Sequence, residues 1–282
     1  MKTQRVLSKK NRINHKLIII EKDIEMKKLI LGTAIAVLAS SVATAQDYQF
    51  EVGAGYMTGD IEGTDVDGYA INAQAHLDKV DTSKGPLNEA AFLDKSSFVT
   101  LAWETLEPDV SGADSFEELT ISGRFVAEGN LIIEAAYQDD DLSDDTNISV
   151  GVGTYLNDNM DAVVTYQTYD DADTNSLSAK VHGINTLEGE TSLAYDLGLG
   201  YIIDDGADDS GYSISAGADY YLDKVLSFGA GIELESATND VSTIDVRANY
   251  FVTPVVRLGL SYMTLGQDAD GDAIKLNAAM RF

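Results

Sequence analysis

The chain has 282 residues, no cysteine and a formal net charge of −28 at pH 7. Hydrophobic residues make up 44% of it, which is too apolar for a disordered chain, and the lack of cysteine excludes a disulfide framework and a thiolate metal site. A field this negative also excludes nucleic acid as a plausible partner.

Residues 26–45 have the features of a secretory signal peptide. The stretch "MKKLILGTAIAVLASSVATAQ" begins with two lysines, continues with an apolar run and ends in small residues, so cleavage is expected after Ala45. A membrane-anchor helix is the alternative, but the run is short and rich in Ser and Thr at its end. Residues 1–25 precede this second methionine and are expected to be a mis-assigned start. The remaining domain, 46–282, carries 10 basic and 44 acidic residues, a net charge of −34.

From residue 46 onward, apolar and polar residues alternate with the two-residue period of a β-strand. Fourteen segments show this pattern, and most have the roughly 9–11 residues that a tilted strand needs to cross a bilayer. Short connectors allow neighbouring segments to pair as antiparallel hairpins. We therefore expect an all-β fold, a transmembrane antiparallel up-and-down β-barrel of about 14 strands, with 12 or 16 as alternatives. The segments are 48–57, 69–78, 97–106, 119–126, 131–138, 147–156, 161–169, 177–184, 191–203, 211–221, 226–234, 244–251, 256–265 and 273–282.

Charged residues fall on one side of this alternation. When the register is chosen from the apolar residues alone, every charged residue inside the segments lies on the opposite face, together with Gly and Ser. A soluble sandwich also alternates, but its dry core needs bulky side chains, so the small and charged residues favour a barrel with a polar lumen. The residues expected to line the pore are Glu51, His76, Glu104, Arg124, Glu134, Lys180, His182, Asp196, Asp219, Glu233, Asp245, Arg247, Arg257, Lys275 and Arg281.

Acidic connectors alternate with tight ones along the chain. The seven odd-numbered connectors carry 26 acidic residues and no basic one, whereas the six others carry 8 acidic and 4 basic residues. Long loops at one end and short turns at the other are typical of outer-membrane barrels. Because lipid cannot satisfy an open sheet edge, the final segment "IKLNAAMRF" is expected to pair with the first one, with lipid covering its apolar face.

The connector 79–96, "KVDTSKGPLNEAAFLDKS", is too long for a tight turn. Gly85-Pro86 breaks a strand, and the stretch that follows places Leu87 and Phe92 on one face of a short helix. Two interpretations remain open. The segment either packs under the barrel as a short helix or turn, or folds partly into the lumen and narrows it, with Leu87 and Phe92 at the constriction.

The decapeptide "KGPLNEAAFL" in this connector resembles a stretch of the family of putative general bacterial porins, and the strand layout and terminal Phe282 are similar too. This resemblance implies passive diffusion of small hydrophilic solutes and ions through the outer membrane of Gram-negative bacteria. Phe282 resembles the aromatic end that the barrel-assembly machinery reads, so we expect it to be an assembly signal. Outer-membrane lipid and lipopolysaccharide are the other expected partners. Connector 139–146 is too short for the inward-folded third loop of the sixteen-stranded trimeric porins, so a monomer is favoured, with a trimer as the alternative.

The charge pattern predicts a mildly cation-selective pore, because both the lining and the acidic connectors would concentrate cations. Basic residues on the last three segments either face acidic residues across the lumen, creating a transverse field, or form ion pairs, for which Asp245 and Arg247 are candidates. A non-conducting structural or adhesion-type barrel is the alternative function. We expect no enzyme, because G-x-S-x-G and H-E-x-x-H motifs are absent. No cofactor or metal is expected either, since "DADGD" lacks the glutamate of an EF-hand loop.

Overall fold

The computed structural model describes residues 47–110, 113–140, 145–169, 174–204, 209–236 and 240–282. The expected signal peptide and the extension before it lie outside the described residues. Among those that are described, no helix has the length and apolar character required to cross a membrane.

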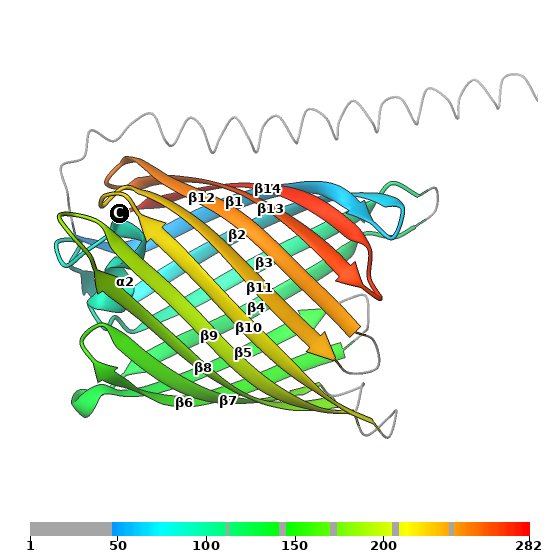
Figure 1. Ribbon diagram of the computed structural model, residues 1–282, viewed down its shortest axis with the longest axis horizontal. Helices are drawn as coiled ribbons and strands as arrows, with labels where there is room; N and C mark the ends of the chain where they lie inside the picture. Colours follow the sequence, from blue (N-terminus) through cyan, green and yellow to red (C-terminus); the bar gives the residue numbers. More distant parts are fainter. Residues whose placement is uncertain (1–46, 111–112, 141–144, 170–173, 205–208, 237–239) are drawn as a thin grey trace, which may run out of the picture. The chain divides into compact units, whose positions relative to one another are not determined.

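Fourteen antiparallel strands close into one barrel, as the alternation predicts (Figure 1). Each strand pairs with its neighbours in the sequence, and β14 pairs with β1 to complete the ring. The strands are β1 Tyr48–Ile61, β2 Thr64–Val80, β3 Phe98–Pro108, β4 Phe116–Val126, β5 Leu131–Asp140, β6 Asp145–Asn157, β7 Met160–Tyr169, β8 Thr174–Thr186, β9 Ser192–Asp204, β10 Asp209–Tyr221, β11 Leu226–Ser236, β12 Asp240–Thr253, β13 Val256–Gln267 and β14 Gly271–Arg281.

The last residue of the chain completes the seam between β14 and β1. Phe282 donates its backbone N–H to the carbonyl of Phe50 at 2.9 Å, and its own carbonyl accepts the N–H of Phe50 at 2.8 Å. The two aromatic rings stack on the outer face with centroids 5.9 Å apart. No backbone edge is therefore left open at this point, which is what a sheet in lipid requires. The role of Phe282 as an assembly signal stays a prediction.

Several strands are longer than the sequence pattern indicates, especially at the acidic connectors. The expected connector 58–68 is reduced to a two-residue turn, Glu62–Gly63, in which both residues have positive φ, 53° and 77°. Two-residue hairpin turns of this kind need positive φ at both positions. The alternation could not reveal the extra strand length, because beyond the apolar band both faces of the hairpin meet water and are polar.

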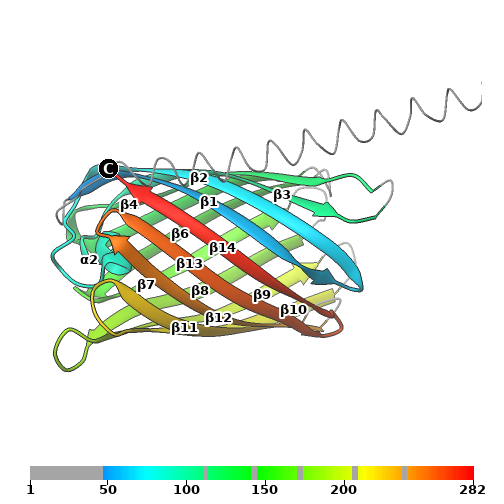
Figure 2. The ribbon, with the colours of Figure 1, turned by 90° about the horizontal axis from the view of Figure 1, so that it is seen from above.

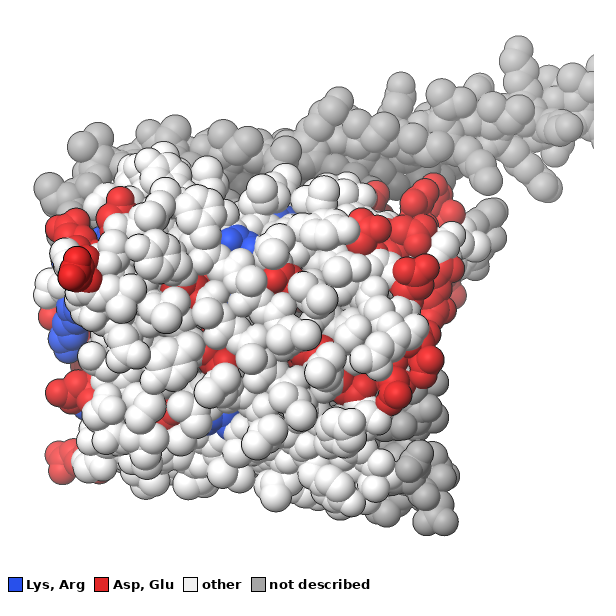
Figure 3. All heavy atoms as spheres, in the orientation of Figure 1, with Lys and Arg blue, Asp and Glu red and all other residues white. Residues whose placement is uncertain are grey.

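The outer wall of the barrel is apolar. Leu276 and Leu101 are 52% and 49% exposed, and large aliphatic or aromatic side chains are exposed in the same register on every strand. An apolar surface of this extent on a closed barrel is covered by lipid acyl chains. Figure 3 shows a mainly uncharged wall, with Asp and Glu densest at one end and both acidic and basic residues at the other.

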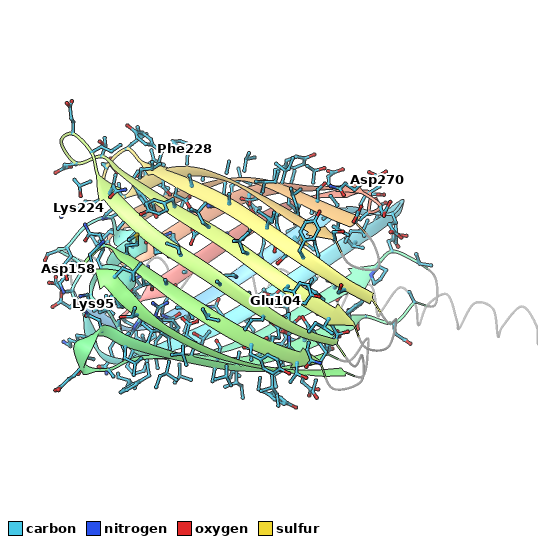
Figure 4. The ribbon with its side chains drawn as sticks, turned by 60° about the horizontal axis from the view of Figure 1, so that its bottom comes forward. Lys95, Glu104, Asp158, Lys224, Phe228 and Asp270 are labelled. Carbon is cyan, nitrogen blue, oxygen red and sulfur yellow. The ribbon has the colours of Figure 1, made fainter. Side chains whose placement is uncertain are left out.

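The two ends of the barrel differ in charge. The longer acidic connectors expected from the sequence are shortened because the strands continue into them, and the longest connector, 81–97, lies at the opposite end. We call the end where β1 meets β2 and β13 meets β14 the acidic end, and the opposite end, which holds Tyr48 and Phe282, the terminal end. Figure 4 shows Asp270 at the acidic end and Lys95, Asp158 and Lys224 at the terminal end. The strands therefore carry the apolar band between a uniformly acidic rim and a rim of mixed charge.

Outward aromatic residues mark the border of the apolar band near the acidic end. The hydroxyl of Tyr56 donates to the Asp67 carboxylate at 2.6 Å, and the indole nitrogen of Trp103 donates to Glu117 at 3.4 Å. Aromatic side chains with an apolar body and a polar tip are enriched at membrane–water interfaces. This border places the acidic rim in water.

Candidate functional site: the barrel interior

Charged side chains of the expected lining form ion pairs across a strand whose inward residue is glycine. Arg247 of β12 binds Asp219 of β10, with Nη2 to Oδ2 at 2.6 Å, although β11 lies between these strands. The inward position of β11 below this pair is Gly229, where an added Cβ would overlap the Asp219 carboxylate and the carbonyl of Ala218. Side chains converge on the inside of a barrel, so a contact over an intervening strand places both residues in the interior.

A second cluster has the same composition of one arginine and two carboxylates. Arg124 of β4 pairs with Glu134 of β5 at 2.9 Å and with Asp161 of β7, which lies two strands beyond the adjacent pair. Its guanidinium also lies 5.6 Å from the ring centroid of Tyr155. Arg247 likewise binds a second carboxylate, Asp245, at 2.7 Å, which confirms the expected Asp245–Arg247 pair. Each cluster keeps an excess of one negative charge.

The third cluster lies at the terminal end and has an excess of positive charge. Glu51 pairs with Arg281 on the adjacent strand and, at 3.7 Å, with Arg257. Arg281 is 5% exposed, because its guanidinium is stacked between the rings of Tyr48 and Phe251. This cluster is packed into the wall and presents little surface to a solute.

His76 is also packed away from open space. It is 2% exposed, with its ring edge-on to Tyr48 and its Nδ1 2.7 Å from the hydroxyl of Ser96. The sequence placed it correctly on the charged face, but neighbouring rings cover it.

Besides His76, four of the expected lining residues form no ion pair with any residue that the structure describes: Glu104, Lys180, Glu233 and Lys275. They belong to four strands spread around the barrel, β3, β8, β11 and β14. Figure 4 shows Glu104 well away from both ends. Glu104 and Lys275 line a shared pocket over the small residues Gly55 and Gly68. These four charges are therefore open to a passing ion or solute, as is Asp196, whose side chain is 59% exposed.

The expected transverse field is thus largely replaced by ion pairs. Arg247 is paired with Asp219 across Gly229, Arg124 is paired with Glu134 and Asp161, and Arg257 and Arg281 share Glu51. Of the four basic residues expected on one side of the lumen, Lys275 alone has no ion-pair partner among the described residues. The sequence could not show this, because several of the partners lie two or three strands apart.

Residues 81–97, here called the inner segment, form the long connector between β2 and β3. The segment contains a 3₁₀ turn, η1 Leu87–Glu89, followed by one helical turn, α2 Ala90–Leu93. Figures 1 and 2 both place α2 within the outline of the barrel at the end where the chain terminates. The short helix expected from the sequence is confirmed.

The inner segment is held from several strands at once. Arg281 donates to the carbonyl of Leu87 at 2.8 Å, and Arg257 donates to the side-chain oxygen of Asn88 at 2.6 Å. On another side, Tyr155 donates its hydroxyl to the carbonyl of Phe92 at 3.0 Å. Strand β6 is distant in the closed ring from the adjacent strands β13 and β14.

Glu89 is the residue of this segment that sequence reasoning missed. It is 8% exposed, and one carboxylate oxygen accepts the hydroxyl of Tyr221 at 2.6 Å. The other oxygen lies 3.0 Å from Nε2 of His182, whose Nδ1 is 2.8 Å from Asp196. The sequence did contain a signal for Glu89: it stands within the apolar stretch "LNEAAFL" of the long connector. A carboxylate that is buried among apolar residues needs a hydrogen-bond or ion-pair partner. The alternation places Asp161 on the charged register, but it was not among the residues expected to line the pore.

A closed antiparallel barrel with an apolar outer wall and a charged interior defines the class of outer-membrane β-barrels. The chain belongs to the family described as putative general bacterial porins, which matches residues 26–282. No curated protein matches the chain.

Solved structures with the same fold are outer-membrane proteins. Omp33 of Acinetobacter baumannii is 21% identical and superposes with a TM-score of 0.63, over 85% of this chain and 100% of that one. A bacterial polysaccharide outer membrane secretin is 12% identical, with a TM-score of 0.51 over 84% of this chain and 99% of the other. At these identities the likeness concerns the fold alone.

Proposed function

We propose that the protein is a passive diffusion channel for small hydrophilic solutes and ions, rather than an enzyme, with a mild preference for cations. The observation that carries this is the polar and charged interior of a closed barrel whose outside is apolar. Charged groups without an ion-pair partner in the interior favour water in the remaining space, and a continuous water-filled lumen conducts.

The cation preference is supported by the negative charge that remains in the interior after the ion pairs are counted. Two arginine clusters each retain one unneutralised carboxylate, and the acidic end adds a rim that has no basic residue in its connectors. Excess negative charge at a low-dielectric entrance raises the local concentration of cations. The barrel works as a monomer in this proposal, since the apolar band continues around the wall.

We further propose that the acidic end faces outward and the terminal end faces the periplasm, after removal of a signal peptide near Ala45. In the sequence pattern the acidic connectors are mostly longer than the others, and bacterial barrels usually carry their longer connections on the outside. Lipopolysaccharide then surrounds the acidic rim, and the barrel-assembly machinery reads the strand that ends in Phe282.

Liposome swelling tests the diffusion itself. Vesicles that contain the refolded protein should swell in isotonic solutions of small sugars and amino acids, at rates that fall as the solute grows. Vesicles with protein that swell no faster than protein-free vesicles would contradict the proposal.

A non-conducting structural barrel is the second candidate, and the inner segment favours it. The segment occupies part of the terminal end and contacts strands on several sides. If it fills the cross-section permanently, the swelling assay gives no signal for any solute.

A further inference from the structure

The inner segment crosses the lumen at the terminal end. Its carbonyl at Leu87 is bound by Arg281 of β14, and its Phe92 ring meets the ring of His182 of β8 with centroids 4.3 Å apart. Strands β14 and β8 are six positions apart along the shorter way around the closed ring of fourteen, and so lie nearly opposite each other. A short stretch that reaches both walls can do so only through the interior.

Both ends of the segment are attached on one side, since it leaves β2 and enters the adjacent β3. A salt bridge between Lys84 and Asp94 joins the two arms near this base. At the arm before the helix, the N–H of Leu87 donates to the carbonyl of Lys224 at 2.8 Å. The part that extends from the base across the lumen is therefore residues 87–93.

Glu89 binds this part to the far wall. Its two carboxylate oxygens have separate partners, Tyr221 of β10 and His182 of β8. Burying a carboxylate is costly unless it is paired and hydrogen-bonded, and a buried apolar residue would pack here without that cost. Both partners of Glu89 lie on the barrel wall. Its buried carboxylate is therefore stabilised only when the inner segment lies against that wall.

We propose that residues 87–93 form the narrowest part of the channel and set the size limit for solutes, with Glu89 as the residue that holds them there. The inference rests on the proposed diffusion function. The limit is set by the half-buried side chains of Asn88, which contacts Arg257 of β13, and Phe92, which contacts His182 of β8. Leu87, expected at the constriction, is 4% exposed and packs away from the open space. Glu89 is a positioning residue, because it acts through the place of the segment and not through contact with the solute.

The test is the size dependence of liposome swelling, measured with a series of neutral sugars from mono- to tetrasaccharides. We expect Glu89→Ala to admit larger sugars, with a severalfold gain in the relative rate for the trisaccharide. Glu89→Gln should lie between wild type and Glu89→Ala, since its amide oxygen still accepts the Tyr221 hydroxyl. Glu128→Gln is the matched control, because Glu128 is exposed in a turn at the terminal end. It should leave the series unchanged.

A variant with residues 85–94 replaced by a short Gly-Ser linker keeps the inference falsifiable if Glu89→Ala does not fold. Heat-modifiable migration on gels identifies folded barrels for every variant. We expect the linker variant to have the highest size limit. If wild type is permeable and the folded linker variant has the same size limit, the inference is wrong and the diffusion function stands. If neither of them is permeable to any sugar, both fail together.

Discussion

Arg247 and Asp219 lie on strands that are not neighbours, and their side chains meet at 2.6 Å across the glycines of β11. Arg124 likewise reaches Asp161 across two strands, but beside the ring of Tyr155. At Arg247 the small inward residues thus give the long charged side chain room to lie against the wall, which keeps the charges paired.

Gly229→Ala should destabilise the barrel, because the new methyl group would overlap the Ala218 carbonyl and displace the Asp219 carboxylate. Overpacking of this kind costs about 1–3 kcal/mol in the free energy of unfolding. Urea unfolding of the protein refolded into vesicles measures it. Gly55→Ala is the matched control, since a Cβ there meets its nearest neighbours at 3.6 Å, an ordinary contact. Equal stability of the two variants would contradict this account of the glycines.

Two substitutions that each remove one positive charge should have different consequences. Arg247→Gln leaves Asp219 and Asp245 unpaired, so we expect a loss of about 1–2 kcal/mol in stability and a stronger cation preference. Lys180→Gln should strengthen the cation preference without loss of stability. Reversal potentials and urea unfolding measured on both proteins check this. A stability loss in Lys180→Gln as large as that in Arg247→Gln would show that the paired and unpaired charges do not differ as described.

Substitution by arginine should destabilise the protein to different extents at two neighbouring residues of β14. Leu276 is 52% exposed on the apolar outer wall, so Leu276→Arg should cost about 2–4 kcal/mol in a bilayer. Asn277→Arg, one position later, points to the polar interior and should cost much less. The comparison uses unfolding in vesicles of defined lipid. Similar losses for both variants would argue against lipid on one face and water on the other.

The contact between Lys95 and Asp158 should depend on pH. The Lys95 ammonium donates to the carboxylate of Asp158 at 2.9 Å in the turn after β6, and this hydrogen bond lowers the pKa of Asp158. Because the folded pKa lies below the unfolded one, the contact contributes above the usual value of about 4 and is lost as the pH falls through the folded pKa. NMR titration of the Asp158 carboxyl carbon should show an upward shift of its pKa in Lys95→Gln. An unchanged titration would exclude the contact in solution.

The number of strands, the face on which each residue lies and the closure of the barrel could be predicted from the sequence. The two-residue alternation that shows them depends only on residues close together in the chain. Leu276 and Lys275, one residue apart, already show which face meets lipid. The pairing of Arg124 with Asp161 could not be predicted, since these residues lie three strands apart and are brought near by the curvature of the wall. The same holds for Glu89, whose partners Tyr221 and His182 depend on the path of the inner segment.

The measurement that tests the central claim most directly is a planar-bilayer recording of the refolded wild-type protein under a KCl gradient. The account predicts discrete openings and a reversal potential that indicates preference for K⁺. The preference should weaken at about 1 M salt, where the screening length falls to about 3 Å. An absence of openings, or a reversal potential that indicates preference for Cl⁻, would contradict it.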